Sequence, residues 1–300
     1  MKMVRKNDPE LVLEAPAKIN LWLHIVGKRD DGYHELRTVM QAVTILDELR
    51  FWRRDDGEVV LDAKGEGLPH DQENLVVKAA CKLQEETGTD FGVTVELTKS
   101  IPVGRGLGGG SSDCAATLKA LNELWELELS RKQICMLAAD LGSDVPFFLW
   151  SGTALCEGRG EEVEPISIDG VVNYVIIVPA VSISTKDVYE AYSAGLTRPV
   201  PTGTITAMLH ALEECDAVEI GRNLRNDLTH PALQVCPELA RIRHEISRMQ
   251  KTQSSTGFGL TGSGSSFFTV HTDGREAREM ACRIEEQLGV TAMAVTNYWL

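Results

Sequence analysis

Long apolar runs, closely spaced cysteines and a signal-peptide core are all absent from this sequence of 300 residues. No run approaches the roughly 20 apolar residues that a transmembrane helix requires. Residues 1–14 contain basic side chains but no apolar segment of a secretory signal. The seven cysteines are widely spaced and include no C-x-x-C pair, which argues against a disulfide framework and a zinc site. We therefore expect a cytoplasmic protein with reduced thiols.

An excess of positive charge is also lacking. The net charge is −14 at pH 7, with 25% charged and 43% hydrophobic residues, the balance of a soluble globular protein. Nucleic acids and anionic membranes would repel such a chain, so we expect neither as a partner. A small molecule is the expected partner, and the chain is expected to be a monomer or a weak homodimer.

Glycine is concentrated in one short segment, because five glycines lie between Gly104 and Gly110. Two serines and Asp113 follow, and apolar residues then recur at helical spacing to residue 125. Glycine permits close backbone approach, Ser and Asp cap helices, and a helix N-terminus attracts anions, so the segment predicts a phosphate site. The alternative, a flexible linker, is not normally joined to a capped amphipathic helix. The segment lacks the Gly-Lys-Ser/Thr of a Walker A loop, and Pro102 interrupts any dinucleotide fingerprint.

The remaining pattern predicts α+β structure in two domains with mixed or antiparallel sheets, divided near residues 164–170. Helices are expected at residues 74–86, 131–141, 186–194, 204–214, 237–249 and 274–288. Strands are expected at residues 11–13, 18–26, 37–51, 58–62, 91–97, 171–179, 258–261, 266–271 and 291–297, with extended structure around residue 155.

Four other segments stand out. Lys18 and Asn20 share one face of a predicted strand, and a loop presents Tyr33 beside His34. Asp144 lies next to an apolar run, where an unpaired carboxylate is costly. A second glycine-rich loop occupies residues 257–266. Taken singly, each has an ordinary explanation, such as a solvated lysine or a surface turn.

Taken together, these segments resemble a known family. Pro16-Ala-Lys-Ile-Asn20, Pro102-x-Gly-x-Gly-Leu-Gly-Gly-Gly-Ser-Ser112 and Leu260-Thr-Gly-Ser-Gly-Ser265 are similar, in order and spacing, to the three motifs of the GHMP kinase superfamily. That group includes galactokinase, homoserine kinase and mevalonate kinases. The resemblance implies a two-domain GHMP kinase fold. Residues 1–165 would form an ATP-binding domain like domain 2 of ribosomal protein S5, and residues 166–300 a ferredoxin-like domain.

The resemblance also implies the reaction, in which ATP phosphorylates an alcohol with Mg²⁺ as cofactor. Asp144 would take the proton of the hydroxyl group, and Lys18 would stabilise charge on that carboxylate and on the transferring phosphoryl group. The sequence does not assign the metal ligands, apart from naming a serine hydroxyl such as Ser112 as a candidate. Residues implied to bind ATP are Pro102, Gly104, Gly106, Leu107, Gly108, Gly109, Gly110, Ser111 and Ser112 at the phosphates, and Asn74 and Lys99 near the adenosine.

The substrate implied by the resemblance is a small alcohol with a cytidine diphosphate head, phosphorylated on its 2-hydroxyl. Asn20 would orient the hydroxyl, Tyr33 and Tyr189 would stack on either side of the cytosine, His34 would hydrogen-bond its edge, and Thr185 would line the same side. Two alternatives are another small-molecule kinase of the superfamily, which needs no aromatic sandwich, and a non-catalytic nucleotide-binding protein. Arg105 departs from the family pattern, either contacting phosphate or pointing to water, and Thr261 replaces the more usual serine.

Overall fold

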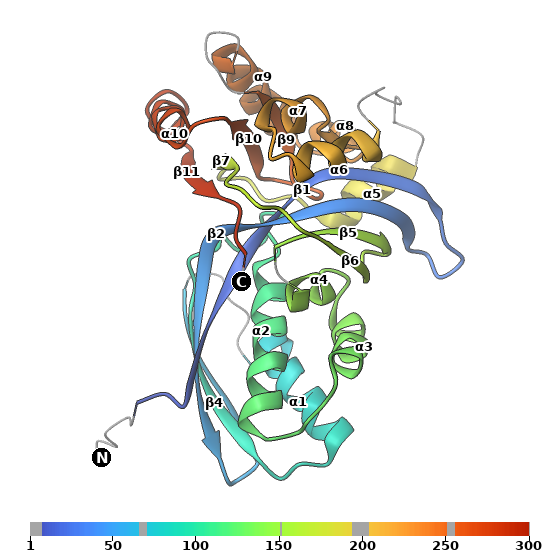
Figure 1. Ribbon diagram of the computed structural model, residues 1–300, viewed down its shortest axis with the longest axis vertical. Helices are drawn as coiled ribbons and strands as arrows, with labels where there is room; N and C mark the ends of the chain where they lie inside the picture. The colour runs from blue at the N-terminus through green and yellow to red at the C-terminus, as the bar shows by residue number, and fades with distance from the viewer. Residues whose placement is uncertain (1–7, 66–70, 151, 194–203, 251–255, 300) are drawn as a thin grey trace. The chain divides into compact units, whose positions relative to one another are not determined.

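The computed structural model describes residues 8–65, 71–150, 152–193, 204–250 and 256–299 (Figure 1). The chain forms two compact units, each described here by itself. Unit 1 comprises Met1–Pro16, Leu46–Val103 and Gly109–Leu149, and unit 2 comprises Ala17–Ile45, Gly104–Gly108 and Trp150–Leu300. Two long strands, β1 (Leu11–Lys28) and β2 (His34–Arg54), supply residues to both units. Each unit is therefore assembled from separate stretches of sequence.

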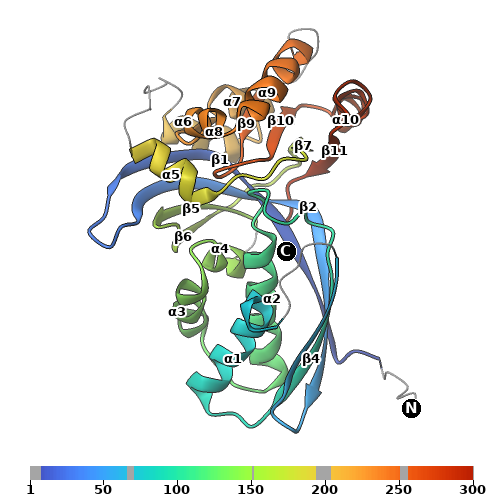
Figure 2. The same cartoon turned by 180° about the vertical axis from the view of Figure 1, so that it is seen from behind.

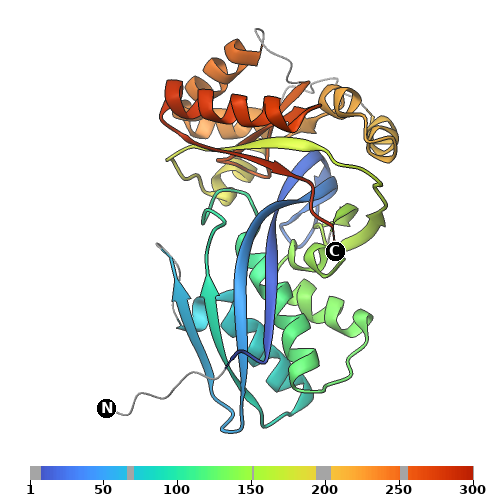
Figure 3. The same ribbon diagram turned by 60° about the vertical axis from the view of Figure 1, so that its left-hand side comes forward.

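Unit 1 is a sheet covered by helices on one face (Figure 3). The second half of β2 pairs antiparallel with β4 (Gly92–Thr98), which pairs parallel with β3 (Val59–Lys64). The helices are α1 (Leu75–Thr87), α2 (Gly109–Leu124) and α3 (Arg131–Leu141), together with the short η1 (Asp71–Glu73) and α4 (Val145–Trp150). Fully buried side chains such as Phe51, Leu83 and Leu118 form the core between sheet and helices.

Unit 2 contains two groups of paired strands. The first half of β2 pairs antiparallel with β5 (Thr153–Gly158), which pairs with β6 (Glu162–Ile166), and β1 pairs parallel with β8 (Arg225–Asn226). The second group is an antiparallel sheet in the order β11 (Thr291–Thr296), β7 (Asn173–Val178), β10 (Phe267–His271) and β9 (Gly257–Leu260).

Helices cover the antiparallel sheet of unit 2. The amphipathic helix α10 (Gly274–Leu288) packs on β7 and β11 (Figure 2). Its Met280 and Ile284 share a core with Ile177 and Phe267. The other helices described in unit 2 are α5 (Thr185–Ser193), α6 (Ile205–Glu213), α7 (Ala217–Arg222), α8 (Thr229–Val235) and α9 (Pro237–Gln250). Within the described residues, no helix is long and apolar enough to cross a membrane.

The predicted α+β structure with mixed and antiparallel sheets is confirmed, but several boundaries differ. β1 is one strand where the sequence indicated two, because Ala15-Pro16 continues the extended backbone instead of breaking it. α2 begins at Gly109, inside the glycine segment and four residues before the expected start. The sequence analysis did not predict α4, α7, α8, β6 or β8.

Candidate active site

Lys18 and Asn20 form a buried polar cluster on β1, in unit 2. The Lys18 ammonium donates to Asn20 Oδ1 at 2.8 Å, and Asn20 Nδ2 donates to the Thr38 hydroxyl at 2.9 Å. The backbone N–H of Asn20 donates to the Thr261 hydroxyl at 3.2 Å. Alternation along the strand puts Lys18 and Asn20 on one face, as predicted from their spacing. The hydrogen bonds then hold a cation and an amide in fixed positions beside the second glycine-rich loop.

The two glycine-rich loops meet at Gly106, also within unit 2. Gly106 has a φ of +78°, and a Cβ there would lie 2.7 Å from the Thr261 carbonyl oxygen and 2.8 Å from that of Gly264. No other residue fits such a position. The Leu107 carbonyl accepts the backbone N–H of Lys18 at 2.9 Å, which ties the loop to β1. Thr261 therefore lies between the first glycine-rich loop and Asn20, since its hydroxyl contacts both the Gly106 carbonyl and the Asn20 N–H.

Arg105 binds the protein itself. Its Nη2 donates to the Ala180 carbonyl at 2.9 Å, and its backbone carbonyl accepts the N–H of Ser266 at 3.2 Å. The sequence left two alternatives for this side chain, phosphate contact or solvent. The structure shows that Arg105 attaches the glycine loop to the segments around Ala180 and Ser266. Its Nη1 is buried and has no hydrogen-bond partner among the described residues, so a phosphate contact stays a prediction.

The second half of the glycine segment belongs to unit 1, where Gly109–Ser112 make the first turn of α2. The first N–H groups of a helix have no partner within it, so they favour an anion. Ser112 is 1% exposed, and its hydroxyl has no hydrogen-bond partner in the described part of the chain. A buried, unpartnered hydroxyl at this position fits a phosphate oxygen or a magnesium ion of a bound nucleotide.

Lys99 lies under the same turn, in a buried ionic trio with Asp47 and Asp113. Its ammonium is 2.7 Å from Asp113 Oδ2 and also pairs with Asp47. The side chains of Lys99, Asp113 and Asp47 are 6, 4 and 0% exposed, respectively. Asp47 Oδ1 accepts the backbone N–H groups of Ser100 at 2.6 Å and Ile101 at 2.9 Å. Burial raises the pKa of Asp113 to about 7; the negative Asp47 adds to this rise, while Lys99 opposes it. Asp113 is therefore an internal counter-ion and not the helix cap that the sequence indicated.

The two ion pairs hold the Lys99 ammonium next to the glycine segment. A Cβ built on Gly109 would lie 3.0 Å from the Lys99 ammonium, so the ammonium is directly beneath the first turn of α2. Asn74, the other residue expected near the adenosine, caps α1 by accepting the N–H of Val76 at 2.9 Å. Adenosine contacts for these two residues stay a prediction.

Asp144 lies in unit 1, in the short turn between α3 and α4. The turn is closed by a hydrogen bond from the backbone N–H of Val145 to the Gly142 carbonyl at 3.1 Å, and Asp144 itself is half-buried. The apolar residues that follow it form the buried helix α4. Lys18 belongs to the other unit, so the pairing of Lys18 with Asp144 stays a prediction.

The aromatic residues of unit 2 form a group around His34. The His34 ring lies 5.0 Å from the ring of Tyr189 at an interplanar angle of 35°, and 6.0 Å from that of Tyr192. Its Nε2 is 3.0 Å from the Ser193 hydroxyl. Burial, with a smaller effect of Lys28, lowers the pKa of His34, which favours the neutral ring. A neutral imidazole both donates and accepts, as recognition of a base edge requires.

Tyr33 has a different neighbour. Its side chain is 55% exposed, and the guanidinium of Arg159 lies 5.1 Å from its ring centre. The ring packed against Tyr189 is that of His34. The stacking of Tyr33 and Tyr189 on either side of a cytosine stays a prediction. Thr185 joins α5 to the second glycine-rich loop, because its hydroxyl is 2.8 Å from that of Ser263. Tyr192 was missed, although its spacing of three residues from Tyr189 on a helix could have indicated it.

Two family models match the chain. The model described as GHMP kinases N terminal domain matches residues 74–152, and GHMP kinases C terminal matches residues 208–289. A homoserine kinase from Cytophaga hutchinsonii shares the fold, with a TM-score of 0.72 over 99% of this chain and 96% of its own, at 19% identity. The fold and the glycine-rich loops therefore define the class of GHMP kinases.

Relatives within this class are more similar. A 4-diphosphocytidyl-2-C-methyl-D-erythritol kinase from Caldicellulosiruptor bescii is 38% identical over 91% of this chain and 93% of its own length. One from Pelotomaculum thermopropionicum is 40% identical over 92% and 96%. A crystal structure of 4-(cytidine 5'-diphospho)-2C-methyl-D-erythritol kinase matches with a TM-score of 0.79 at 33% identity, over 96% of this chain and all of that one. The chain belongs to the 4-diphosphocytidyl-2-C-methyl-D-erythritol kinase family.

Proposed function

We propose that this protein transfers the γ-phosphoryl group of ATP to the 2-hydroxyl of 4-diphosphocytidyl-2-C-methyl-D-erythritol, in the non-mevalonate route to isoprenoid precursors. The observation that carries the proposal is the buried Lys18–Asn20 pair, held against the second glycine-rich loop by Thr261. Burying a lysine is costly unless its ammonium is used. Phosphoryl transfer uses such a group, because catalysis there depends on positioning and on neutralising charge.

In this reaction Asp144 accepts the proton of the substrate hydroxyl. The hydroxyl oxygen forms a bond to the γ-phosphorus, the bond from that phosphorus to the β-γ bridging oxygen breaks, and ADP leaves. Lys18 offsets negative charge on the transferring group, while Asn20 fixes the position of the Lys18 ammonium by accepting its hydrogen bond.

The nucleotide phosphates are held by the first turn of α2. Its N–H groups would donate hydrogen bonds to the phosphates, and the Ser112 hydroxyl would bind a phosphate oxygen or the magnesium ion. The magnesium ion supplies charge neutralisation on those phosphates. Among the described residues, no group of three or more His, Cys, Asp or Glu side chains is arranged to hold a metal ion. The ion is therefore expected to be held mainly by the nucleotide.

The cytosine head is recognised by the aromatic residues of unit 2. Tyr189 offers a ring for stacking, and His34 offers a neutral imidazole whose nitrogens match the edge of a base. A substrate without a base has no use for this group. This distinguishes the proposal from a kinase of the same superfamily that acts on homoserine or mevalonate.

Asp144→Asn tests the mechanism. It removes the proton acceptor and keeps the size of the side chain, so we expect turnover to fall by roughly 10²–10⁴-fold while ATP still binds. ADP release is measured with Mg-ATP and a panel of alcohols, with and without a cytidine diphosphate head. Near wild-type turnover of the variant would remove Asp144 from the mechanism. Equal turnover of an alcohol without the head would favour another member of the superfamily.

A further inference from the structure

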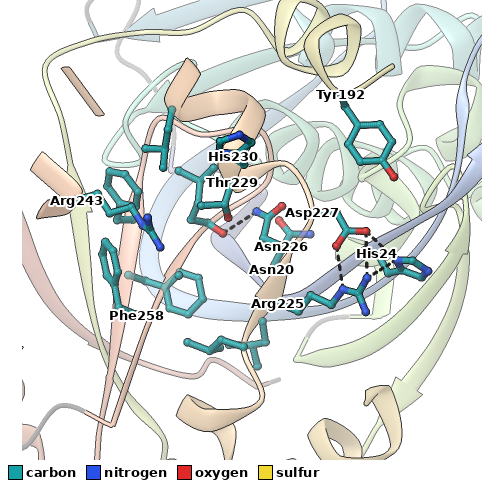
Figure 4. A pocket seen from close by; sticks show the side chains of 17 residues that line it. Asn20, His24, Tyr192, Arg225, Asn226, Asp227, Thr229, His230, Arg243 and Phe258 are labelled. Carbon is teal, nitrogen blue, oxygen red and sulfur yellow. Dashed lines mark hydrogen bonds and ion pairs between the residues drawn. The ribbon is translucent and has the colours of Figure 1, made fainter. Parts of the chain in front are cut away.

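A cavity of about 490 Å³ lies within unit 2, walled by helices α8 and α9 and strands β1, β8, β9 and β10 (Figure 4). This is the size of an ordinary small-molecule site. Of the residues assigned above to ATP or substrate, Asn20 lines it, together with Tyr192 of the aromatic group around His34. The cavity is therefore largely separate from the proposed reaction site.

One part of the cavity is apolar. Phe258 and Phe267 form a stacked pair with ring centres 5.1 Å apart, and Leu233 and Leu260 lie beside them on the wall. Phe258 and Leu233 are only partly buried, whereas Phe267 and Leu260 are 0 and 1% exposed, so Phe258 and Leu233 supply the accessible apolar surface of this lining. Covering such a surface with an apolar group is favourable.

The lining contains two arginines, two histidines and one carboxylate, in a chain whose net charge is −14. The carboxylate, Asp227, is already neutralised. Its Oδ2 is 2.7 Å from His24 Nδ1 and accepts the N–H of Ile25 at 3.0 Å, and its Oδ1 accepts Arg225 Nε at 2.9 Å. This cluster leaves the second arginine of the lining, Arg243, as a positive charge without a counter-ion among the described residues of the cavity.

Arg243 differs from its neighbours on α9. Arg241 pairs with Glu238 at 2.6 Å, and Arg248 pairs with Glu245 at 3.1 Å, each three residues away. Arg243 makes no hydrogen bond or ion pair with any other described residue, and it reaches toward the cavity beside Thr229 and His230 of α8 (Figure 4). A guanidinium placed in this way is suited to a carboxylate or phosphate.

We propose that this cavity binds a small amphiphilic anion, with its apolar chain on Phe258 and Leu233 and its phosphate or carboxylate on Arg243. The wall is linked to the reaction site, since Asn226 Nδ2 donates to the carbonyls of Leu260 and Gly262 at 2.8 Å each. Gly262 belongs to the loop that packs on Lys18 and Asn20.

Isothermal titration of the full chain with butyl phosphate, hexyl phosphate, hexanoate and inorganic phosphate tests this site. We expect saturable binding that tightens by about three- to fourfold for each added CH₂ group, and none for inorganic phosphate. Comparison of hexyl phosphate with hexanoate identifies the preferred anion. Arg243→Gln should weaken binding by about ten- to a hundredfold, because it removes a charged hydrogen bond. Arg241→Gln, on the same helix but outside the cavity, is the control and should bind as the wild type does.

Two results would overturn the proposal. One is the absence of saturable binding by every chain-bearing anion. The other is binding that Arg243→Gln leaves unchanged, which would move the anion to a different site, such as the first turn of α2. Arg243 is exposed on its helix, so the variant is expected to fold normally.

Discussion

Lys99→Met would leave two buried carboxylates without their shared cation. Removing one partner of a buried ion pair typically costs about 3–5 kcal/mol of unfolding free energy. We expect Lys99→Met to lose about 3 kcal/mol of unfolding free energy at pH 8, the lower end of this range, because Asp47 and Asp113 each limit the loss. Asp47 keeps its hydrogen bonds from the N–H groups of Ser100 and Ile101. Asp113, whose pKa is already about 7, will bind a proton once the lysine is gone.

The effect of Lys99→Met should therefore depend on pH. Protonating Asp113 becomes easier as the pH falls, so the deficit relative to wild type should shrink between pH 8 and pH 6. Adding Asp113→Asn should recover about 1–2 kcal/mol at pH 8, because it removes one of the two charges. Urea denaturation of the wild type, the single variant and the double variant measures all three quantities. A deficit below about 1 kcal/mol, or a double variant less stable than Lys99→Met, would refute the account of the trio.

Three further predictions concern single residues. Gly106→Ala should lose about 1–3 kcal/mol more unfolding free energy than Gly104→Ala; the first methyl meets the Thr261 carbonyl at 2.7 Å, and the second has no atom nearer than 3.8 Å at a similar φ. Equal losses by urea denaturation would mean that the contact with the second loop is unimportant. Tyr189→Ala should raise KM for the cytidine-headed substrate in line with a stacking loss of about 1–3 kcal/mol and leave KM for ATP unchanged. Tyr189→Phe should be nearly silent, and a wild-type KM for the alanine variant would exclude stacking. Burial lowers the pKa of His271 to about 4. As the pH falls from 6.5 to 4, this histidine is therefore protonated in the unfolded chain before it is protonated in the folded one. The unfolding free energy should then fall by at most about 1.4 kcal/mol per pH unit. His271→Gln should flatten that part of the stability curve, and an unchanged slope would assign the loss to other groups.

Most elements with a strong local signal were predictable from the sequence. The helices at residues 131–141 and 274–288 were predicted with the bounds that the structure has. Both have amphipathic periodicity and a side-chain cap, from Ser130 and Asp273. The missed helix α4 has no polar face, since five of its six residues are buried, so periodicity could not separate it from a strand.

The site was predictable only where its residues are close in sequence. Lys18 and Asn20 lie two residues apart on one strand, so their shared face follows from alternation. The partners of Lys99 are 14 and 52 residues away, and Asp227 is 203 residues from His24. Contacts over such separations are set by the topology, which a local pattern does not contain. For the same reason, Asp113 was assigned to a helix cap when its charge is used inside the unit.

The interleaving of the two units in the sequence affects how the chain can fold during synthesis. Leu23, Ile25 and Leu36 leave the ribosome early, yet their buried cluster includes Met280 and Ala292. These early strands must therefore wait for almost the whole chain before they are covered, a delay that favours aggregation of the nascent protein. A chain that ends at residue 165 would leave the three side chains exposed permanently. We expect such a fragment to need a chaperone or its missing half, supplied in trans, to stay in solution.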